Sequence, residues 1–333
     1  MIGIKDVAKA AGVSTATVSR VLADKPYVRE QVRDHVMAVV KKLNYSPNRV
    51  ARSLRSRSSK IIGLIVSDIG NPFFQQVSRA VEDTASEQGF SVVLCNNDEN
   101  PNKEETYLQL LRDENVAGVV LSPTRQAADD FARFSTYNIP MVVIDRRVSN
   151  FQVDNILIDN VQSAHTIVSH LVEHGYRRIG AIFGIGGTTG RERRQGYVQA
   201  LKGHNIEPIP DLIKYANPKE EDGFSTTKKL LRLHEPPDAL LASNSLLAAG
   251  AIRALQEEKV GIPDNIAFAS FDETSWSTLV VPALTVIEQP TYEIGRTATQ
   301  LLLKRIQDPT RSHREVILKA RMIVRQSCGC SIS

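Results

Sequence analysis

The sequence predicts a small all-α domain at the N-terminus followed by a two-lobed α/β domain. Apolar residues recur at helical spacing from Ile4 to Leu43. From Ile61 onward, short β-rich apolar runs alternate with helix-length stretches, which is typical of βαβ units with parallel sheets. The chain has 333 residues, too many for one ordinary core. We therefore expect the all-α domain over 1–46, a linker over 47–58 and the two-lobed domain over 59–333.

Three helices are expected in the N-terminal domain. Gly12 should end the first helix as a C-terminal cap, and the second should open at Ser14, whose hydroxyl can accept a hydrogen bond from a backbone N–H two or three residues on. The third spans Glu30 to Leu43. The residues expected to face the small core are Ile4, Val7, Ala8, Ala11, Val18, Val21, Leu22, Val32, Val36, Val39, Val40 and Leu43.

The second of these helices has the features of a DNA-recognition helix. With its apolar side turned inward, Thr15, Ala16, Thr17 and Arg20 are left wholly or partly exposed. Two short helices joined by a glycine-containing turn, the second presenting small residues and an arginine, fit a major groove. An N-terminal helix-turn-helix DNA-binding domain is therefore predicted.

The distribution of charge supports a nucleic-acid partner. Residues 1–60 carry 13 Lys or Arg and 4 Asp or Glu, whereas the rest of the chain carries 28 Lys or Arg and 33 Asp or Glu. Basic charge gathered on one small module is the electrostatic signature of binding to a polyanion, because each phosphate that is neutralised releases a counterion.

Two adjacent segments resemble a known family. Residues 4–22, IKDVAKAAGVSTATVSRVL, resemble the helix-turn-helix signature of the lactose-repressor and purine-repressor (LacI/GalR) family, and residues 44–56, NYSPNRVARSLRS, resemble its hinge. The resemblance implies a transcription regulator of the repressor type that binds pseudo-palindromic double-stranded operator DNA under the control of a small effector. It also implies that Thr15, Ala16 and Arg20 face base edges, where arginine can pair with guanine.

The predicted hinge is short, which limits when it can form a helix. Pro47 presets a helix start, but the segment from Asn48 to Leu54 is too short to form a stable isolated helix. The resemblance implies that it folds when two copies pair on DNA and that Leu54 wedges into the minor groove. The alternative is that Leu54 only packs within a linker. The DNA-contacting residues expected here are Asn48, Ala51, Leu54 and Arg55.

In the second domain, polar residues follow the predicted strands. We expect strands at 61–66, 91–95, 117–121, 141–144, 179–183, 239–242, 266–270 and 284–287. Ligands of such folds bind beyond the carboxyl ends of the strands. The pattern is similar to periplasmic sugar-binding proteins, and the resemblance places the effector contacts on Ser67, Phe73, Phe74, Asp145, Arg193, Asn244, Asp272 and Gln289.

These residue types favour a sugar, because carboxylate, amide and guanidinium groups satisfy hydroxyls while aromatic side chains cover a ring. Trp276 could supply a further ring, and Arg146 and Arg191 could help Arg193 to hold a phosphate or carboxylate on the sugar. Taken singly, each position is equally well explained as an ordinary loop polar residue or core aromatic. Asn244-Ser245 departs from the Asn-Asp that is frequent in the family, so the details of polyol recognition stay open.

Three other patterns suggest chemistry but are incomplete. His170-Leu171-Val172-Glu173-His174 matches a zinc-peptidase pattern without a third ligand, and His174 is explained as a helix C-terminal cation. The glycine-rich run 184–190 lacks the last glycine of a dinucleotide-binding loop. The pair Cys328 and Cys330 is half of a metal site. Neither a metal nor a cofactor is expected.

The remaining expectations concern cellular context and assembly. The sequence has neither a membrane-length apolar run nor a secretory start, and its three cysteines suit a reducing compartment, so a cytoplasmic protein without a membrane partner is expected. One helix-turn-helix contacts too little DNA for specificity, which predicts a homodimer. The alternatives are a sugar-modifying enzyme fused to a DNA-binding module and an extracellular binding protein. The effector's identity, and whether it induces or co-represses, stay open.

Overall fold

The computed structural model describes residues 2–22, 25–45, 59–125, 131–148 and 151–330. Contacts divide the chain into two compact units, Met1–Ser59 and Lys60–Ser333. The predicted hinge, with its candidate residues Asn48, Ala51, Leu54 and Arg55, lies outside the described residues. Within the described part of the chain, no helix is long and apolar enough to cross a membrane.

The first unit contains the three expected helices, α1 (Ile4–Ala10), α2 (Thr15–Leu22) and α3 (Glu30–Lys42). Its core forms around Val7, Val18 and Val36, which are fully buried. Gly12 follows α1 with a φ of +62°, a left-handed conformation that glycine adopts without strain. The Ser14 hydroxyl accepts a hydrogen bond from the Thr17 backbone N–H at 3.1 Å, which caps α2 as predicted.

The second unit begins with a six-stranded parallel sheet, which forms the core of the first lobe. Its spatial order is β11-β5-β4-β3-β1-β2. The strands are β1 (Ile61–Val66), β2 (Ser91–Asn96), β3 (Gly118–Leu121), β4 (Met141–Ile144), β5 (Asp154–Ile158) and β11 (Glu315–Leu318). The helices of this lobe are α5 (Pro72–Glu87), α6 (Pro101–Asp113), the 3-10 helix η1 (Phe131–Tyr137) and α12 (Thr291–Gln307).

A second six-stranded sheet forms the core of the second lobe, in the order β12-β10-β9-β8-β6-β7. Its strands are β6 (Ile179–Gly184), β7 (Ile213–Ala216), β8 (Ala239–Ala242), β9 (Ala267–Phe271), β10 (Thr285–Glu288) and β12 (Arg321–Ile323), and only β12 is antiparallel to its neighbour. The helices of this lobe are α8 (Asn160–Glu173), α9 (Thr188–Gly203), α10 (Glu220–Leu231) and α11 (Ser245–Glu257), with the 3-10 helices η2 (Pro210–Leu212) and η3 (Gln326–Cys328).

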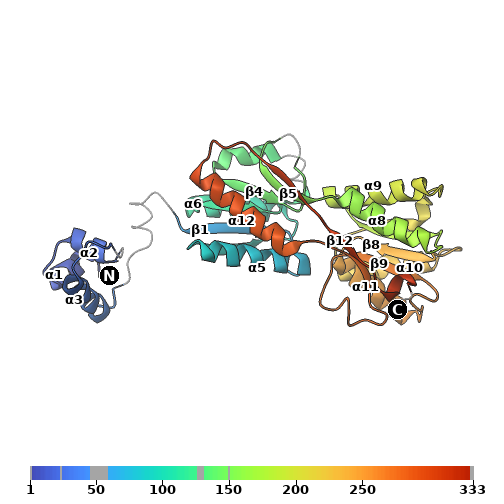
Figure 1. Cartoon of the computed structure of the whole chain (residues 1–333), viewed down its shortest axis with the longest axis horizontal. Helices are drawn as coiled ribbons and strands as arrows, with labels where there is room; N and C mark the ends of the chain where they lie inside the picture. The colour runs from blue at the N-terminus through green and yellow to red at the C-terminus, as the bar shows by residue number, and fades with distance from the viewer. Residues whose placement is uncertain (1, 23–24, 46–58, 126–130, 149–150, 331–333) are drawn as a thin grey trace. The chain divides into compact units, whose positions relative to one another are not determined.

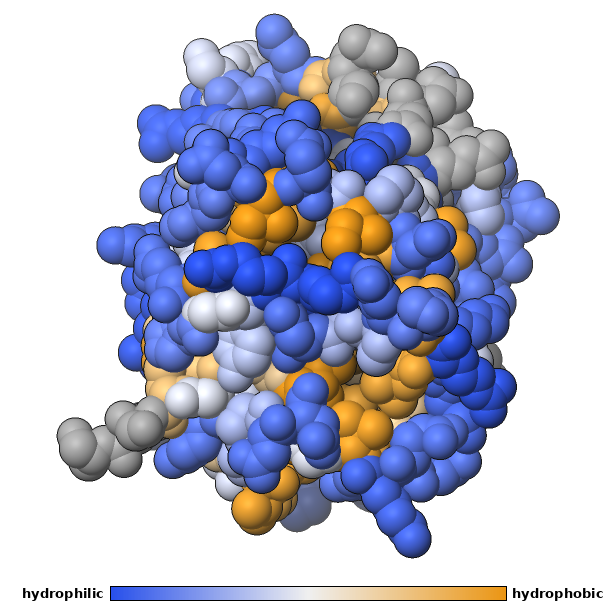
Figure 2. Space-filling model, turned by 90° about the vertical axis from the view of Figure 1, so that its right-hand side faces the viewer, coloured by the Kyte–Doolittle hydropathy of each residue, from blue (hydrophilic) through white to orange (hydrophobic). Residues whose placement is uncertain are grey.

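Helices cover both sheets of the second unit (Figure 1), which explains why the central strands are almost entirely apolar. Every residue of β3, β8 and β9 is buried. At the surface, Figure 2 shows an end of the molecule where hydrophilic residues dominate and hydrophobic residues form separate patches. Apolar burial by sheet and helix faces therefore stabilises each lobe.

The chain passes between the lobes three times, and this positions the site. It leaves the first sheet after β5, returns from β10 to α12, and crosses again between β11 and β12. In each sheet the strand order reverses at the first strand of the lobe, β1 or β6. Ligands of doubly wound sheets bind beside such reversals, outside the carboxyl ends of the strands.

The predicted two-lobed α/β fold is confirmed, and each predicted strand matches an observed one to within a residue at either end. Four strands were not predicted: β5, β7, β11 and β12. The last three lie at sheet edges or beside them and are short and partly exposed, so their sequences carry little apolar signal. Strand β5 is buried throughout, but it opens with the polar residues Asp154 and Asn155, which interrupt the apolar pattern of its sequence.

Candidate functional site

The first unit presents one face of α2 to solvent. Thr15, Ala16 and Arg20 are exposed, and Thr17 is partly buried. The opposite side of α2 is buried in the core of the unit. A short helix with one side fixed by packing, and with small residues and an arginine on the other, can enter a major groove without steric obstruction.

A pocket of about 350 Å³ lies between the two lobes of the second unit. All eight residues predicted for the effector line it: Ser67, Phe73, Phe74, Asp145, Arg193, Asn244, Asp272 and Gln289. Ser67, Asp145, Asn244, Asp272 and Gln289 each lie within two residues of the carboxyl end of a strand. The volume is near the lower end of the range for small-molecule sites, which is about 300–1,000 Å³.

Asp272 is held rigidly in the second lobe. Its Oδ1 accepts a hydrogen bond from Gln289 Nε2 at 2.6 Å, and its Oδ2 accepts one from the Ser245 backbone N–H at 3.1 Å. The backbone of Asp272 has a φ of +73°, in the left-handed region where aspartate and asparagine are tolerated best among side-chain-bearing residues. This carboxylate is therefore preorganised, with lone pairs left to accept hydrogen bonds from a ligand.

Arg193 is buried in the pocket wall and has fixed partners. Its Nε donates to Asn160 Oδ1 at 2.8 Å, and its Nη1 donates to the Ser243 carbonyl oxygen. The guanidinium lies over the ring of Phe271, 4.1 Å from the ring centroid. Because two of its donors are already engaged, Arg193 serves as a fixed, directional donor rather than as a mobile charge.

Asp145 also has a left-handed backbone, with a φ of +70°. Burial raises the pKa of Asp145 to about 6, although the positive charges of Arg146 and Arg193 act to lower it. Burial removes the water that would stabilise the negative charge of Asp145. A ligand hydroxyl that donates a hydrogen bond to this carboxylate would replace that water.

A network that the sequence analysis did not assign forms another wall of the pocket. Glu99 accepts hydrogen bonds from both Arg146 and Arg125, and the Arg125 Nε lies 3.3 Å from Glu99 Oε2. Burial acts to raise the pKa of Glu99, but the two guanidinium groups more than offset it and leave that pKa below its usual value. Glu99 and Arg125 lie three and four residues beyond β2 and β3, so a search that extended further past each strand end would have found both.

Polar contacts join the lobes across the pocket. Lys219 Nζ lies 2.5 Å from Asp68 Oδ2, and Arg125 Nη1 donates to the Ile185 carbonyl oxygen at 3.0 Å. Lys219, like Asp98, Asn217 and Asp222, lines the pocket from a loop or helix start and was not predicted. Lys219 follows β7, a strand that the sequence did not predict, so a search of strand ends could not point to it.

Two residues suggested as helpers do not line the pocket. Trp276 packs against a core cluster of the second lobe that includes Leu284 and Val286. Arg191 is exposed on α9, on the side of the helix opposite to the buried Arg193. The aromatic contribution to the pocket comes instead from Phe73 and Phe74, whose rings meet edge to face at 4.9 Å.

The charge of the pocket is unbalanced. Its described lining contains six carboxylates, on Asp68, Asp98, Glu99, Asp145, Asp222 and Asp272, and four cations, on Arg125, Arg146, Arg193 and Lys219. Each of these four cations already has a polar partner in this lining or beside it. The arrangement offers more acceptors than donors to a ligand, which suits hydroxyl groups and opposes an anion.

Two family models match the chain over nearly its full length. Residues 3–48 match the bacterial regulatory proteins of the lacI family, and residues 59–326 match the periplasmic binding proteins and sugar binding domain of the LacI family.

Curated relatives are similar over the whole chain. The ribose operon repressor of Halalkalibacterium halodurans is 37% identical over 328 residues, which cover 98% of this chain and 97% of the relative. The HTH-type transcriptional repressor PurR of Mannheimia succiniciproducens is 32% identical and covers 98% of each chain.

Solved structures show the same fold. The Lac repressor dimer bound to operator and the anti-inducer ONPF superposes with a TM-score of 0.86, at 27% identity and over 98% of this chain and 99% of that one. A putative ribose operon repressor from Burkholderia thailandensis has a TM-score of 0.73, with 31% identity, and covers 80% of this chain and 99% of that one.

Proposed function

The chain belongs to the LacI family of bacterial transcription regulators, and we propose from this that an uncharged sugar, bound between the lobes, controls its affinity for operator DNA. DNA binding by a repressor of this family, under control of a small effector, is the function of its relatives as a group. The identity of the effector is the part that this proposal adds.

The single observation that carries the proposal is the excess of acceptors in the pocket. Asp145 and Asp272 offer carboxylate oxygens from opposite lobes, and Arg193 supplies a directional donor in the same lining. Vicinal hydroxyl groups satisfy such a set because each can donate to a carboxylate and accept from a guanidinium. Phe73 and Phe74 can cover the apolar face of the ring.

A phosphorylated or carboxylated sugar fits this pocket less well than the sequence suggested. Arg146 is paired with Glu99, and Lys219 is paired with Asp68, so neither guanidinium nor ammonium is available to an added anion without losing its partner. Of the six carboxylates in the described lining, Asp98 is paired with Lys103 outside it, and the remaining surplus of one carboxylate adds repulsion. Because charges interact more strongly inside a pocket than in water, this repulsion disfavours a ligand that carries a negative charge.

D-Ribose is the first candidate within this class. The pocket of about 350 Å³ suits a monosaccharide, and the relative that is 37% identical is a ribose operon repressor. Ribose carries hydroxyl groups around a small ring and no charge, as the lining requires.

Control of DNA binding follows from the position of the pocket. A sugar that contacts both lobes favours the interlobe angle at which it makes the most contacts, by its difference in affinity between angles. In a homodimer, that angle would set the spacing of the two segments that lead to the DNA-binding units. A change in that spacing would alter how well two DNA-binding units fit the two halves of an operator.

The ligand class can be tested by thermal shift and calorimetry on the full-length protein. D-ribose, D-ribose 5-phosphate, D-ribonate, common hexoses and nucleobases form the panel. The expected result is a rise in Tm with an uncharged sugar, a much smaller rise with its phosphate or acid, and no rise with that sugar in Asp272→Asn. Asparagine is used because it tolerates the left-handed backbone at this position.

A response confined to phosphorylated sugars or to nucleobases would overturn the assignment of the ligand class. A response that persists in Asp272→Asn would place the ligand elsewhere. Recovery of the sugar unchanged after long incubation separates a regulator from the alternative of a sugar-modifying enzyme.

A further inference from the structure

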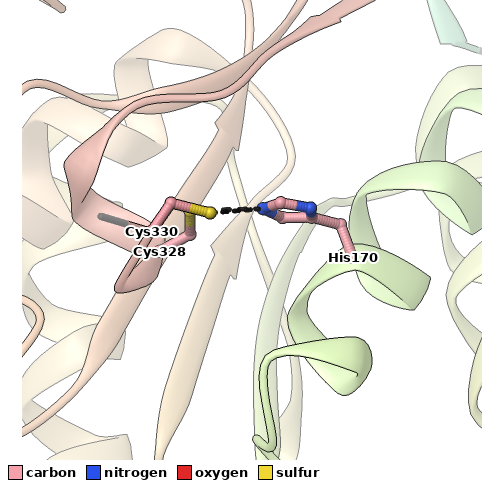
Figure 3. Close-up of side chains that lie close together, drawn as sticks. All are labelled: His170, Cys328 and Cys330. Atoms are coloured by element: carbon pink, nitrogen blue, oxygen red, sulfur yellow. Dashed lines mark hydrogen bonds between the residues drawn. The ribbon is translucent and has the colours of Figure 1, made fainter. Parts of the chain in front are cut away.

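The two incomplete metal-binding patterns in the sequence, the His170–His174 pair and the Cys328–Cys330 pair, lie together in the second lobe. His170 lies on α8, and Cys328 and Cys330 lie at the C-terminal end of the described chain (Figure 3). His170 Nε2 is 3.2 Å from Cys328 Sγ and 3.7 Å from Cys330 Sγ. All three ligand atoms lie within 4.8 Å of one another.

His174 adds a fourth donor one helical turn further along the chain. Its Nε2 lies 2.8 Å from Cys330 Sγ, and its ring lies 4.2 Å from that of His170. His174 Nδ1 is 2.8 Å from the His170 carbonyl oxygen, to which it can donate only if this nitrogen carries the proton. That tautomer leaves the Nε2 lone pair directed at the thiols, which is the orientation that a metal-binding histidine needs.

The backbone of the C-terminal segment is shaped to turn both thiols the same way. Gly329 has a φ of +84°, and a Cβ at this position would lie 2.6 Å from the Tyr176 hydroxyl oxygen. Any side chain there would be opposed both by backbone strain and by this contact. Ser327, just before the pair, is anchored in the core, since its Oγ donates to the Phe268 carbonyl oxygen at 2.7 Å.

We propose that His170, His174, Cys328 and Cys330 form a tetrahedral Cys2His2 site for Zn²⁺. Zinc binds sulfur at about 2.3 Å and imidazole nitrogen at about 2.0–2.1 Å, so a tetrahedral site places sulfur and nitrogen roughly 3.5 Å apart. The observed sulfur-to-nitrogen distances of 2.8, 3.2 and 3.7 Å lie around that value. His170, Cys328 and Cys330 already lie close enough to share one ion, and rotation of the exposed His174 side chain would bring its Nε2 to the fourth position.

The chemistry of the donors selects the metal class. Two thiols and two imidazoles are soft or borderline ligands, which disfavours Mg²⁺ and Ca²⁺ and suits Zn²⁺. Cys328 is buried and Cys330 is partly buried, whereas His174 is exposed and gives an ion access from solvent. Binding requires both thiols to lose their protons to the solvent as the two Zn–S bonds form.

The site would join the end of the chain to α8. Residues 326–330 contact the second sheet and α8, so a bound ion would cross-link helix and C-terminal segment within one lobe. This role is independent of the sugar pocket, none of whose lining residues belongs to the site. Metal binding therefore stabilises the second lobe whatever the effector is.

Cobalt provides the test because tetrahedral thiolate coordination gives it distinctive absorption. Full-length protein is reduced, stripped with a chelator and titrated anaerobically with Co²⁺. We expect one cobalt per chain, thiolate-to-cobalt charge-transfer absorption, intense visible bands, and loss of these bands on adding Zn²⁺. X-ray absorption of the zinc form should show two sulfur and two nitrogen neighbours at about 2.3 and 2.0–2.1 Å.

Substitution of single side chains tests which residues bind the metal. Cys330→Ser and His174→Asn change residues outside the core and should each weaken metal binding by at least the roughly 10–100-fold that loss of an outer-shell partner costs. The matched controls are His165→Asn, on the same helix, and Cys95→Ser, in the first lobe, which should bind cobalt like the wild type. Circular dichroism of the metal-free proteins checks that each variant is folded.

Weak octahedral cobalt bands, or unchanged affinity in Cys330→Ser and His174→Asn, would overturn the proposal. So would a Cys328–Cys330 disulfide that forms in the presence of stoichiometric zinc and prevents its binding.

Discussion

At the scale of single residues, Arg20 is the side chain on which sequence discrimination should depend most. It is exposed on α2, and its guanidinium can form two hydrogen bonds with guanine. Arg20→Ala should therefore weaken binding to the selected operator by about 1–3 kcal/mol and relax the preference at one base pair. Fluorescence anisotropy on matched operator and random duplexes measures this difference.

The control for Arg20 is Lys42→Ala, which removes the same charge from the last turn of α3. Lys42→Ala should weaken binding to operator and random DNA to a similar degree. Equal weakening on both duplexes by Arg20→Ala would show instead that Arg20 contacts only phosphate.

The buried carboxyl group of Asp145 should make the free energy of unfolding depend on pH. Its pKa is about 6 in the folded protein and near 3.8 in an unfolded chain, so the folded state binds the proton more tightly. The free energy of unfolding therefore decreases as pH rises from about 4 to 6. Asp145→Asn avoids this cost, and it should raise the stability of the ligand-free protein at pH 7.5 by roughly 1–3 kcal/mol while impairing effector binding.

Urea denaturation of wild type and Asp145→Asn at pH 4.5 and pH 7.5 measures the effect. The advantage of the variant should shrink at the lower pH. A constant advantage, or a lower stability of the variant at pH 7.5, would show that Asp145 is not a destabilising buried charge.

The eight pocket-lining residues proposed for the effector could be predicted because most of them follow a strand or lie in the first turn of the next helix, while Arg193 lies one turn further along α9. The sequence could not show which groups these side chains form hydrogen bonds and ion pairs with. That Arg193 is engaged by Asn160 and Ser243, and that Arg146 is neutralised by Glu99, depends on contacts between distant segments. These contacts changed the expected ligand from one that could carry phosphate to an uncharged sugar.

At the scale of elements, close helix packing limits what the second lobe tolerates. Gly250 on α11 lies against α10, where an added Cβ would come within 1.9 Å of the Glu220 carbonyl oxygen. Gly250→Ala should therefore push α10 and α11 apart and lower stability by about 1–3 kcal/mol or more. It should also weaken effector binding, because Asn244, the N-cap of α11, lines the pocket.

Gly203→Ala is the matched control, since a Cβ at the end of α9 would meet no atom within 4 Å. It should leave stability unchanged or raise it by up to about 1 kcal/mol. Thermal unfolding measures the Tm of Gly250→Ala and Gly203→Ala. Equal Tm values for the two variants would contradict close packing of α10 against α11 at Gly250.

Some strands could be predicted from the sequence and others could not. The buried strands β1, β3, β8 and β9 were predicted from apolar runs, and α2 from its cap and its apolar face. Strands β11 and β12 were missed because each pairs with a strand far away in sequence and leaves residues exposed. The Cys2His2 cluster was missed for a related reason: α8 and η3 lie 158 residues apart at His170 and Cys328.

At the scale of the whole molecule, the DNA affinity should reside in the first unit. Its excess of positive charge, 12 basic residues against 4 acidic ones over residues 1–59, would neutralise several phosphates. Log K should then fall linearly with the logarithm of salt concentration, by about 0.9 per phosphate contact. Removal of residues 1–57 should abolish operator binding and leave sugar binding intact.

Calorimetry and anisotropy on the full chain and on residues 58–333 measure both activities. Specific duplex binding by the shortened protein would contradict the assignment of DNA binding to the first unit. Loss of sugar binding would show that the pocket depends on residues outside the second unit.

The central claim, that an uncharged sugar between the lobes controls operator binding, is tested most directly by one titration. The operator is selected from random duplex DNA, and its Kd is measured with and without D-ribose for the wild type and for Asp272→Asn. We predict a change in Kd of at least about fivefold for the wild type, typical of allosteric coupling, and none for the variant. An unchanged wild-type Kd with D-ribose and with every uncharged sugar of the panel, or an equal response in Asp272→Asn, would contradict the account.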